Sequence, residues 1–338
     1  MYISSPGIKI AETETLLRPL VFVVVSIVSA IPTFLIYKKF KESEENATSL
    51  FGSKFFKVVA GIYAVVYLVG IVRTVARFDL FASSELFPGT EMTLFIIALV
   101  VVCALLSLLK LGALSRAAVI FVIIVGVATG FVMLSLVEEV DFLNFTPLFE
   151  SGALNFISDS LLFAVQASEL GTIIWVLDEL KGNIPKTFVW WLVFSAVSII
   201  AVLFFVIGTL GVFADTQLFP TYTAVTLAKF GLLERMDALE TAIWILCVVE
   251  KVAFYFFVIT KSFKYILPKV SGKVVCTVAA ALVSVAITFI SSDLERFSFI
   301  SYTPVVLSMY IIPVVLLPVA IIIYLKKVKP REKSVETD

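Results

Sequence analysis

The sequence predicts an all-α polytopic membrane protein with a single integral membrane domain over residues 1–338. Of the 338 residues, 60% are hydrophobic, and the mean hydropathy is +1.08. Nine apolar runs approach or exceed the roughly 20 residues that a transmembrane helix needs. Most of the linkers between these runs are short, as in a tight helical bundle. A soluble globular domain does not have this composition.

The apolar runs lie near 19–37, 57–77, 92–109, 117–137, 154–176, 187–211, 238–260, 272–290 and 299–325. Each is predicted to be a helix, because a helix satisfies its own backbone polar groups in lipid. Some runs contain proline, so neighbouring helices must satisfy the freed carbonyls: Pro32, Pro304, Pro313 and Pro318. Residues 212–235 are too polar to span and are expected to form an external loop with an amphipathic helix over the bundle.

Basic residues gather after alternate runs. The segments after the first, third, fifth, seventh and ninth runs hold 18 of the 26 basic residues. By the positive-inside rule these segments, and the C-terminus, are expected to be cytoplasmic. Nine spans would then leave residue 1 outside without a signal sequence. We therefore expect an incomplete first span, with ISSPGIKIAETETLL as its outer half and ten spans in a full protein.

The run at 154–176 is unusually polar. Asp159, Phe163, Gln166 and Glu169 recur at helical spacing and predict one stripe that faces protein or a water-filled cavity. A charge at bilayer depth costs roughly 2.5–3.5 kcal/mol and is by default a functional hypothesis. The segment Gln166-Ala167-Ser168, with Gly171 supplying backbone freedom, indicates an unwound turn of the kind that binds ligands in transporters. The alternative is that Glu169 only fixes packing through a salt bridge.

The run at 238–260 places Glu240, Cys247, Lys251 and Tyr255 on one broad face. Lys251 precedes Lys261 by ten residues, which places it roughly 15 Å deep, at the level expected for Glu169. We expect these two charges to pair across the bundle, although Lys251 snorkelling to the interface is the alternative. Glu250 points about 100° away from Lys251 and is not expected to face the same cavity.

The run at 57–77 carries Tyr63 and Tyr67 one turn apart, which either line the cavity or pack. Arg73 and Arg77, toward the outer end of this run, are expected to pair with Asp79 or Glu85. Histidine is absent from the sequence, and its three cysteines lie far apart in apolar runs. The common catalytic, nucleotide-binding and zinc motifs are also missing. We therefore expect no enzyme, no metal, no cofactor and no nucleic-acid partner.

Several segments carry a family resemblance. These are FTPLFESG (145–152), FAVQASE (163–169), LFPTYTAVTLAKFGLLERMDALETAIWIL (218–246) and VVEKVAFYFFVITKSFKYIL (248–267). They resemble the endospore germination permease family, the B subunits of nutrient-germinant receptors within the amino acid–polyamine–organocation transporter superfamily. The block from Phe219 to Lys251 is the most specific part.

The resemblance implies the five-plus-five inverted-repeat transporter fold, in which spans one and six are broken and hold the ligand. Residues 1–137 would be an incomplete first repeat, 142–325 the second repeat and 326–338 a cytoplasmic tail. The resemblance and the polar stripes together give the expected ligand-binding residues as Ser4, Ser5, Pro6, Gly7, Tyr63, Tyr67, Phe163, Gln166, Ser168, Glu169, Lys251 and Tyr255.

The implied function is that of a germinant-receptor subunit in the inner spore membrane, or the bacterial cell membrane. It would bind a small nutrient, such as an amino acid, and signal to A-type and C-type partner subunits. Two alternatives stay open. One is an amino acid secondary transporter with the same fold, and the other is a structural subunit whose site is vestigial.

Overall fold

The computed structural model describes residues 10–42, 53–88, 90–147, 152–177, 179–180, 182–228, 236–290 and 301–332, and the statements below concern these residues. Within these ranges the chain is helical and contains no strand. The main helices are α1 (Arg18–Glu42), α3 (Lys54–Phe81), α4 (Thr93–Ser107), α5 (Leu111–Ser135), α6 (Ala153–Ala164), α7 (Ile184–Leu210), α8 (Pro220–Leu227), α9 (Asp237–Ile266), α10 (Gly272–Ile290), α12 (Thr303–Tyr310) and α13 (Leu317–Glu332). Short 3-10 segments η1 (Thr13–Leu17) and η5 (Ser168–Trp175) and a π segment η7 (Ile311–Leu316) complete the parts used below.

The predicted fold class is confirmed, and in each of the nine apolar runs most of the described residues are helical. Seven helical stretches of the described chain are long and apolar enough to cross a membrane. Of the other two runs, α4 is shorter, with 15 residues, and the run at 154–176 is divided between α6 and η5. The nine-span count, the inverted repeat and its boundaries stay predictions.

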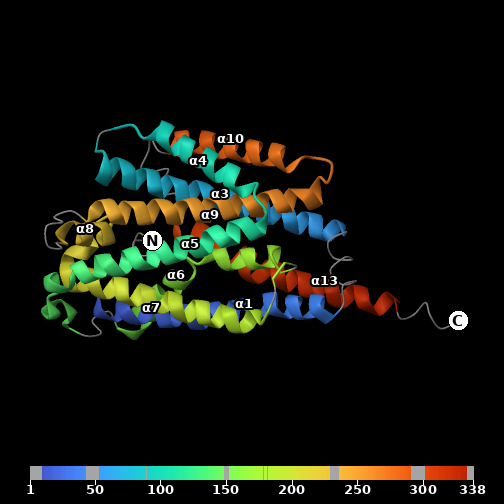
Figure 1. Ribbon diagram of the computed structural model, residues 1–338. Coiled ribbons are helices and arrows are strands. Elements are labelled where there is room, and N and C mark those ends of the chain that lie inside the picture. The colour runs from blue at the N-terminus through green and yellow to red at the C-terminus, as the bar shows by residue number, and fades with distance from the viewer. Residues whose placement is uncertain are drawn as a thin grey trace.

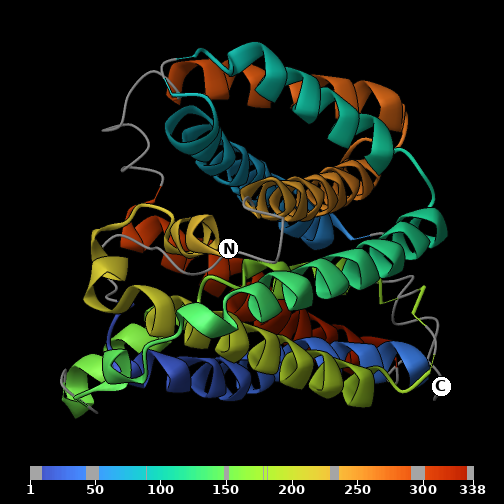
Figure 2. The same cartoon turned by 60° about the vertical axis from the view of Figure 1, so that its left-hand side comes forward.

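The helices form two groups that are separated in both views (Figures 1 and 2). One contains α3, α4, α9 and α10, and the other contains α1, α6, α7 and α13. Two main apolar cores lie in these groups, and the first core also takes in Ile36 of α1 and Ile321 of α13. Tyr63, Val100 and Phe256 are buried in the first, and Phe22, Phe163 and Leu192 in the second. α5 runs between the groups and packs mainly on α9.

The closest packing in the first group lies between α3 and α9. Gly70 makes this possible, because a Cβ at that position would lie 2.9 Å from the Tyr255 ring. At one end of the bundle, Phe81, Phe219 and Trp244 form an aromatic cluster that joins α3, the start of α8 and α9. We call this the α8 end. The helix predicted within 212–235 is confirmed as α8, while residues 229–235 lie outside the described part.

Candidate ligand-binding site

The run at 154–176 is broken where the sequence indicates an unwound turn. The α-helix α6 ends at Ala164. The amide of Val165 still donates to a carbonyl four residues back, whereas those of Gln166 and Ala167 donate three residues back. The chain then continues as the 3-10 segment η5, which has eight residues. Since 3-10 segments rarely exceed three or four residues, other contacts must hold this conformation.

Three buried tyrosines supply such contacts. The Tyr67 hydroxyl donates to the carbonyl oxygen of Ser168 at 3.4 Å, and the Tyr255 and Ser168 hydroxyls lie 3.3 Å apart. The Tyr63 hydroxyl donates to the carbonyl oxygen of Pro313 in η7 at 2.7 Å. In a π turn the donor to this carbonyl would be the fifth residue on, which is Pro318 and has no N–H, so the tyrosine hydroxyl supplies a donor in its place. The tyrosines therefore connect α3 and α9 to both irregular segments.

Gly171 has a different role from the one predicted. It is not among the glycines with a left-handed backbone. Instead, a Cβ on Gly171 would lie 2.6 Å from the Tyr67 hydroxyl oxygen and 2.7 Å from Cβ of Pro313. The residue is glycine because η5 and η7 approach each other closely here, so the expectation of backbone freedom was wrong.

The two midplane charges meet. The Lys251 ammonium of α9 forms an ion pair with the Glu169 carboxylate of η5, and this prediction is confirmed. The side chains are 24% and 28% exposed, so neither charge is fully desolvated. An opposite charge at contact distance offsets the cost of placing each group inside a membrane protein.

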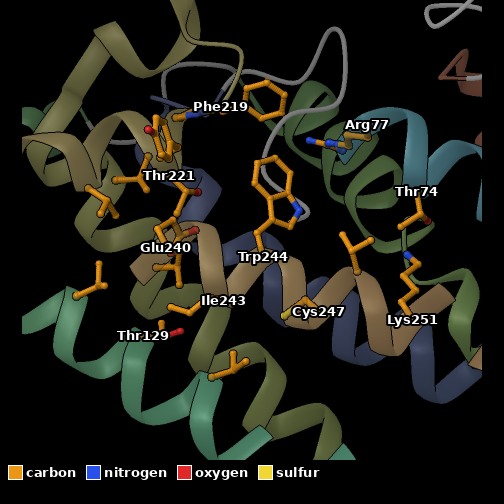
Figure 3. Close-up of a pocket in the computed structure, with 18 of the residues that line it drawn as sticks. Thr74, Arg77, Thr129, Phe219, Thr221, Glu240, Ile243, Trp244, Cys247 and Lys251 are labelled. Carbon is orange, nitrogen blue, oxygen red and sulfur yellow. The ribbon is translucent and has the colours of Figure 1, made fainter. Parts of the chain in front are cut away.

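A cavity of about 600 Å³ opens beside this ion pair and extends toward the α8 end. Its walls come from α3, α5, α7, α8 and α9 and from the break, and they are mostly apolar. Figure 3 shows part of the lining, with Arg77, Glu240, Trp244, Cys247 and Lys251 around the space. The charged residues that border the cavity are Arg73, Arg77, Glu169, Glu240, Glu250 and Lys251.

Four of the predicted ligand-binding residues border this cavity, namely Gln166, Glu169, Lys251 and Tyr255. Four others are buried behind its wall and are not among the residues that line it, namely Tyr63, Tyr67, Phe163 and Ser168. The remaining four, Ser4, Ser5, Pro6 and Gly7, lie outside the described residues.

The residues of the predicted polar stripe in the run at 154–176 do face protein or the cavity, but they do not form one continuous helical face. Because the helix ends at Ala164, its two ends face different surroundings. Asp159 accepts a hydrogen bond from the buried Arg18 guanidinium at 3.3 Å, and Phe163 packs edge-on against Phe22. Only the residues at and beyond the break reach the cavity.

On α9, the predicted face is confirmed, since Glu240, Cys247, Lys251 and Tyr255 all border the cavity. The exclusion of Glu250 was wrong, because Glu250 borders the cavity as well. The physical reason is that the cavity extends around a wide arc of α9, so side chains about 100° apart can both reach it.

Arg73 and Arg77 were missed as site residues. Both border the cavity, and the Arg73 guanidinium donates to the side-chain oxygen of Gln166 at 2.8 Å. A signal was present in the sequence, because two arginines one turn apart near the end of an apolar run define one face of the helix. We did not use this signal, because pairing with nearby acidic residues was a simpler explanation for the two arginines.

The make-up of the cavity bears on what it could hold. Among the described residues, no group of three His, Cys, Asp or Glu side chains could hold a metal ion. The cavity combines an apolar wall with charges of both signs, which is the usual make-up of a small-molecule site.

Comparison with known families matches residues 10–300 to the family described as spore germination protein. This range includes the break and every residue that borders the cavity. None of the curated proteins compared with the chain is similar enough to count as a relative.

Proposed function

Since the chain belongs to the spore germination protein family, we propose that it is the permease-like subunit of a nutrient-germinant receptor. In this proposal it binds a small nutrient, such as an amino acid, in the cavity beside the broken span. The observation that carries the proposal is the Glu169–Lys251 ion pair at the break, because it places ionisable groups and irregular backbone at one cavity inside the helical bundle.

The mechanism that we propose is a population shift. A ligand that binds one arrangement of the two helix groups more tightly than the other moves the equilibrium toward it. Glu169 belongs to η5 and Lys251 to α9, so their ion pair joins the broken span to the first helix group. A ligand that competes for either charge would change the relative free energy of the two arrangements.

The proposal includes a location and partners. We propose that the protein lies in the inner membrane of the spore with a cytoplasmic C-terminus, and that A-type and C-type receptor subunits receive the signal. The asymmetric placement of basic residues supports this orientation.

The test is the nutrient response of spores that carry the chain with its neighbouring receptor subunits as their sole receptor. Glu169→Gln and Lys251→Met should each abolish germination in response to L-amino acids at equal protein level in the membrane. The matched control is Glu179→Gln, because Glu179 also pairs with a lysine of α9, Lys261, at 2.8 Å but does not border the cavity. This control should respond normally.

Normal dose–response curves for both Glu169→Gln and Lys251→Met would contradict the site assignment. An amino acid secondary transporter is the second candidate, and the same ion pair favours it as a coupling device. Uptake of labelled amino acid into vesicles that contain the purified chain alone would support the transporter. Dependence of germination on the partner subunits, without uptake, would support the receptor.

A further inference from the structure

We propose that Arg73 and Arg77 form an anion subsite that binds the carboxylate of the ligand, while Glu240 binds its ammonium group. The ligand is then a zwitterion with an apolar portion, held across the cavity between α3 and α9. This inference rests on the proposed function and identifies the side chains that would recognise the ligand.

The two arginines are placed for binding one oxyanion. They are four residues apart on α3, which puts them on the same face of the helix one turn apart. Both are partly exposed, and both border the cavity. Guanidinium groups are planar donors that match a carboxylate in a bidentate geometry.

The hydrogen bond from Arg73 to Gln166 leaves this role open. A guanidinium carries five N–H donors, so Arg73 can hold the Gln166 side chain and a carboxylate together. Gln166 is a neutral acceptor within the break and orients Arg73 without cancelling its charge. A carboxylate bound at Arg73 would therefore lie next to the unwound turn.

The cavity is bordered by cations from α3, whereas α9 contributes Glu240 and Glu250 together with Lys251. The part of α3 that borders it contributes Arg73 and Arg77 and no acid. The Glu169 carboxylate is already paired with Lys251. On α9, Glu240 lies near the α8 end, and Figure 3 shows it on the opposite side of Trp244 from Arg77. A ligand with separated charges would place its anion toward α3 and its cation toward Glu240.

The space between these charges suits an apolar group. Between Glu240 and Lys251, α9 contributes Ile243, Trp244 and Cys247 to the cavity wall. The Phe219 ring lies next to the Trp244 ring (Figure 3). The cavity volume of about 600 Å³ falls in the range of small-molecule sites, about 300–1,000 Å³. An amino acid with an apolar side chain fits this combination of charges and surface.

The experiment measures binding to the purified full chain in lipid nanodiscs. Each standard L-amino acid is tested in tritium-labelled form, and the best ligand is then competed with its own amide and with its N-acetyl derivative. The amide lacks the carboxylate charge, and the N-acetyl form lacks the ammonium charge. Both should compete about tenfold or more weakly than the parent amino acid with the wild-type chain.

The variants should remove these preferences selectively. Arg73→Gln and Arg77→Gln should each weaken binding about tenfold and reduce the discrimination between acid and amide. Arg77→Lys should show a smaller loss, because lysine keeps the charge but not the fork of donors. Glu240→Gln should instead reduce the discrimination against the N-acetyl form. Arg116→Gln, at the start of α5 and away from the cavity, should bind as wild type.

The outcomes separate the two proposals. If the wild-type chain binds no amino acid, the proposed function and the subsite both fail. If it binds one but the amide competes equally, or if both arginine-to-glutamine variants keep the acid–amide ratio, only the subsite is overturned. The amide competition uses the wild-type chain, so this result is available even if a variant does not fold.

Discussion

Replacing Gly171 with alanine should damage the contact between the broken span and the last span. The added Cβ would lie 2.7 Å from Cβ of Pro313 and 3.0 Å from its carbonyl carbon. Carbon atoms prefer separations of about 3.5–4.0 Å, so η5 and η7 would have to separate by about 1 Å. Because Pro313 presents rigid ring and backbone atoms, the strain cannot be relieved by a rotamer change. Overpacking of this kind costs about 1–3 kcal/mol.

The matched control is Gly126→Ala on α5, where a Cβ would have nothing within 4 Å. Alanine is favoured over glycine inside a helix by up to about 1 kcal/mol, so this variant should be as stable as wild type or more stable. Both variants are measured by SDS titration in mixed micelles, followed by tryptophan fluorescence. Equal stability of Gly171→Ala and Gly126→Ala would refute the close approach between η5 and η7.

Three further substitutions test the polar contacts, each by the same unfolding measurement. Asp159→Asn should cost about 1–3 kcal/mol, because it removes a carboxylate partner of the fully buried Arg18 guanidinium, which also pairs with Glu12. Glu179→Gln should cost less than about 1 kcal/mol, because Glu179 is 46% exposed in its pair with Lys261. A larger loss for Glu179→Gln than for Asp159→Asn would contradict this ordering. Tyr63→Phe should cost about 1 kcal/mol by removing the hydroxyl that donates to the Pro313 carbonyl of η7, and an unchanged stability would show that this bond contributes nothing.

The positions of most helices could be predicted from the sequence, because membrane-spanning helices are recognised by their length and apolar composition. The position of the break also followed, since Gln166 and Ser168 interrupt an apolar run that ends in a glycine-containing segment. The directions of the side chains beyond the break could not be predicted from the sequence. Helical periodicity assumes 3.6 residues per turn, and the change to a 3-10 segment after Ala167 rotates every later side chain. The polar stripe therefore failed at this point.

The site was predicted in part for a related reason. Lys251 and Glu169 could be matched because depth in the membrane is a single coordinate that residue counting gives for each helix. The direction in which a side chain points within the bundle depends on which helices pack together, and counting residues along one helix does not give this direction. Tyr63 and Tyr67 have the correct depth but point into the core, whereas Arg73 and Arg77, further along α3, point into the cavity.

The break lies in a span that contacts both helix groups, because η5, which follows it, packs on α1 and η7 as well as on α9. Before the break, α6 packs on α1 and is tied to it by the Arg18–Asp159 ion pair. After the break, the chain is tied to α9 by the pairs of Glu169 with Lys251 and of Glu179 with Lys261. A relative movement of the two groups would act differently on the two halves of this span, because only the half after the break is paired with lysines of α9. The turn at Gln166–Ala167 can absorb such a movement, because its amides donate three residues back instead of four, and the cavity that we propose as the ligand site lies directly beside it.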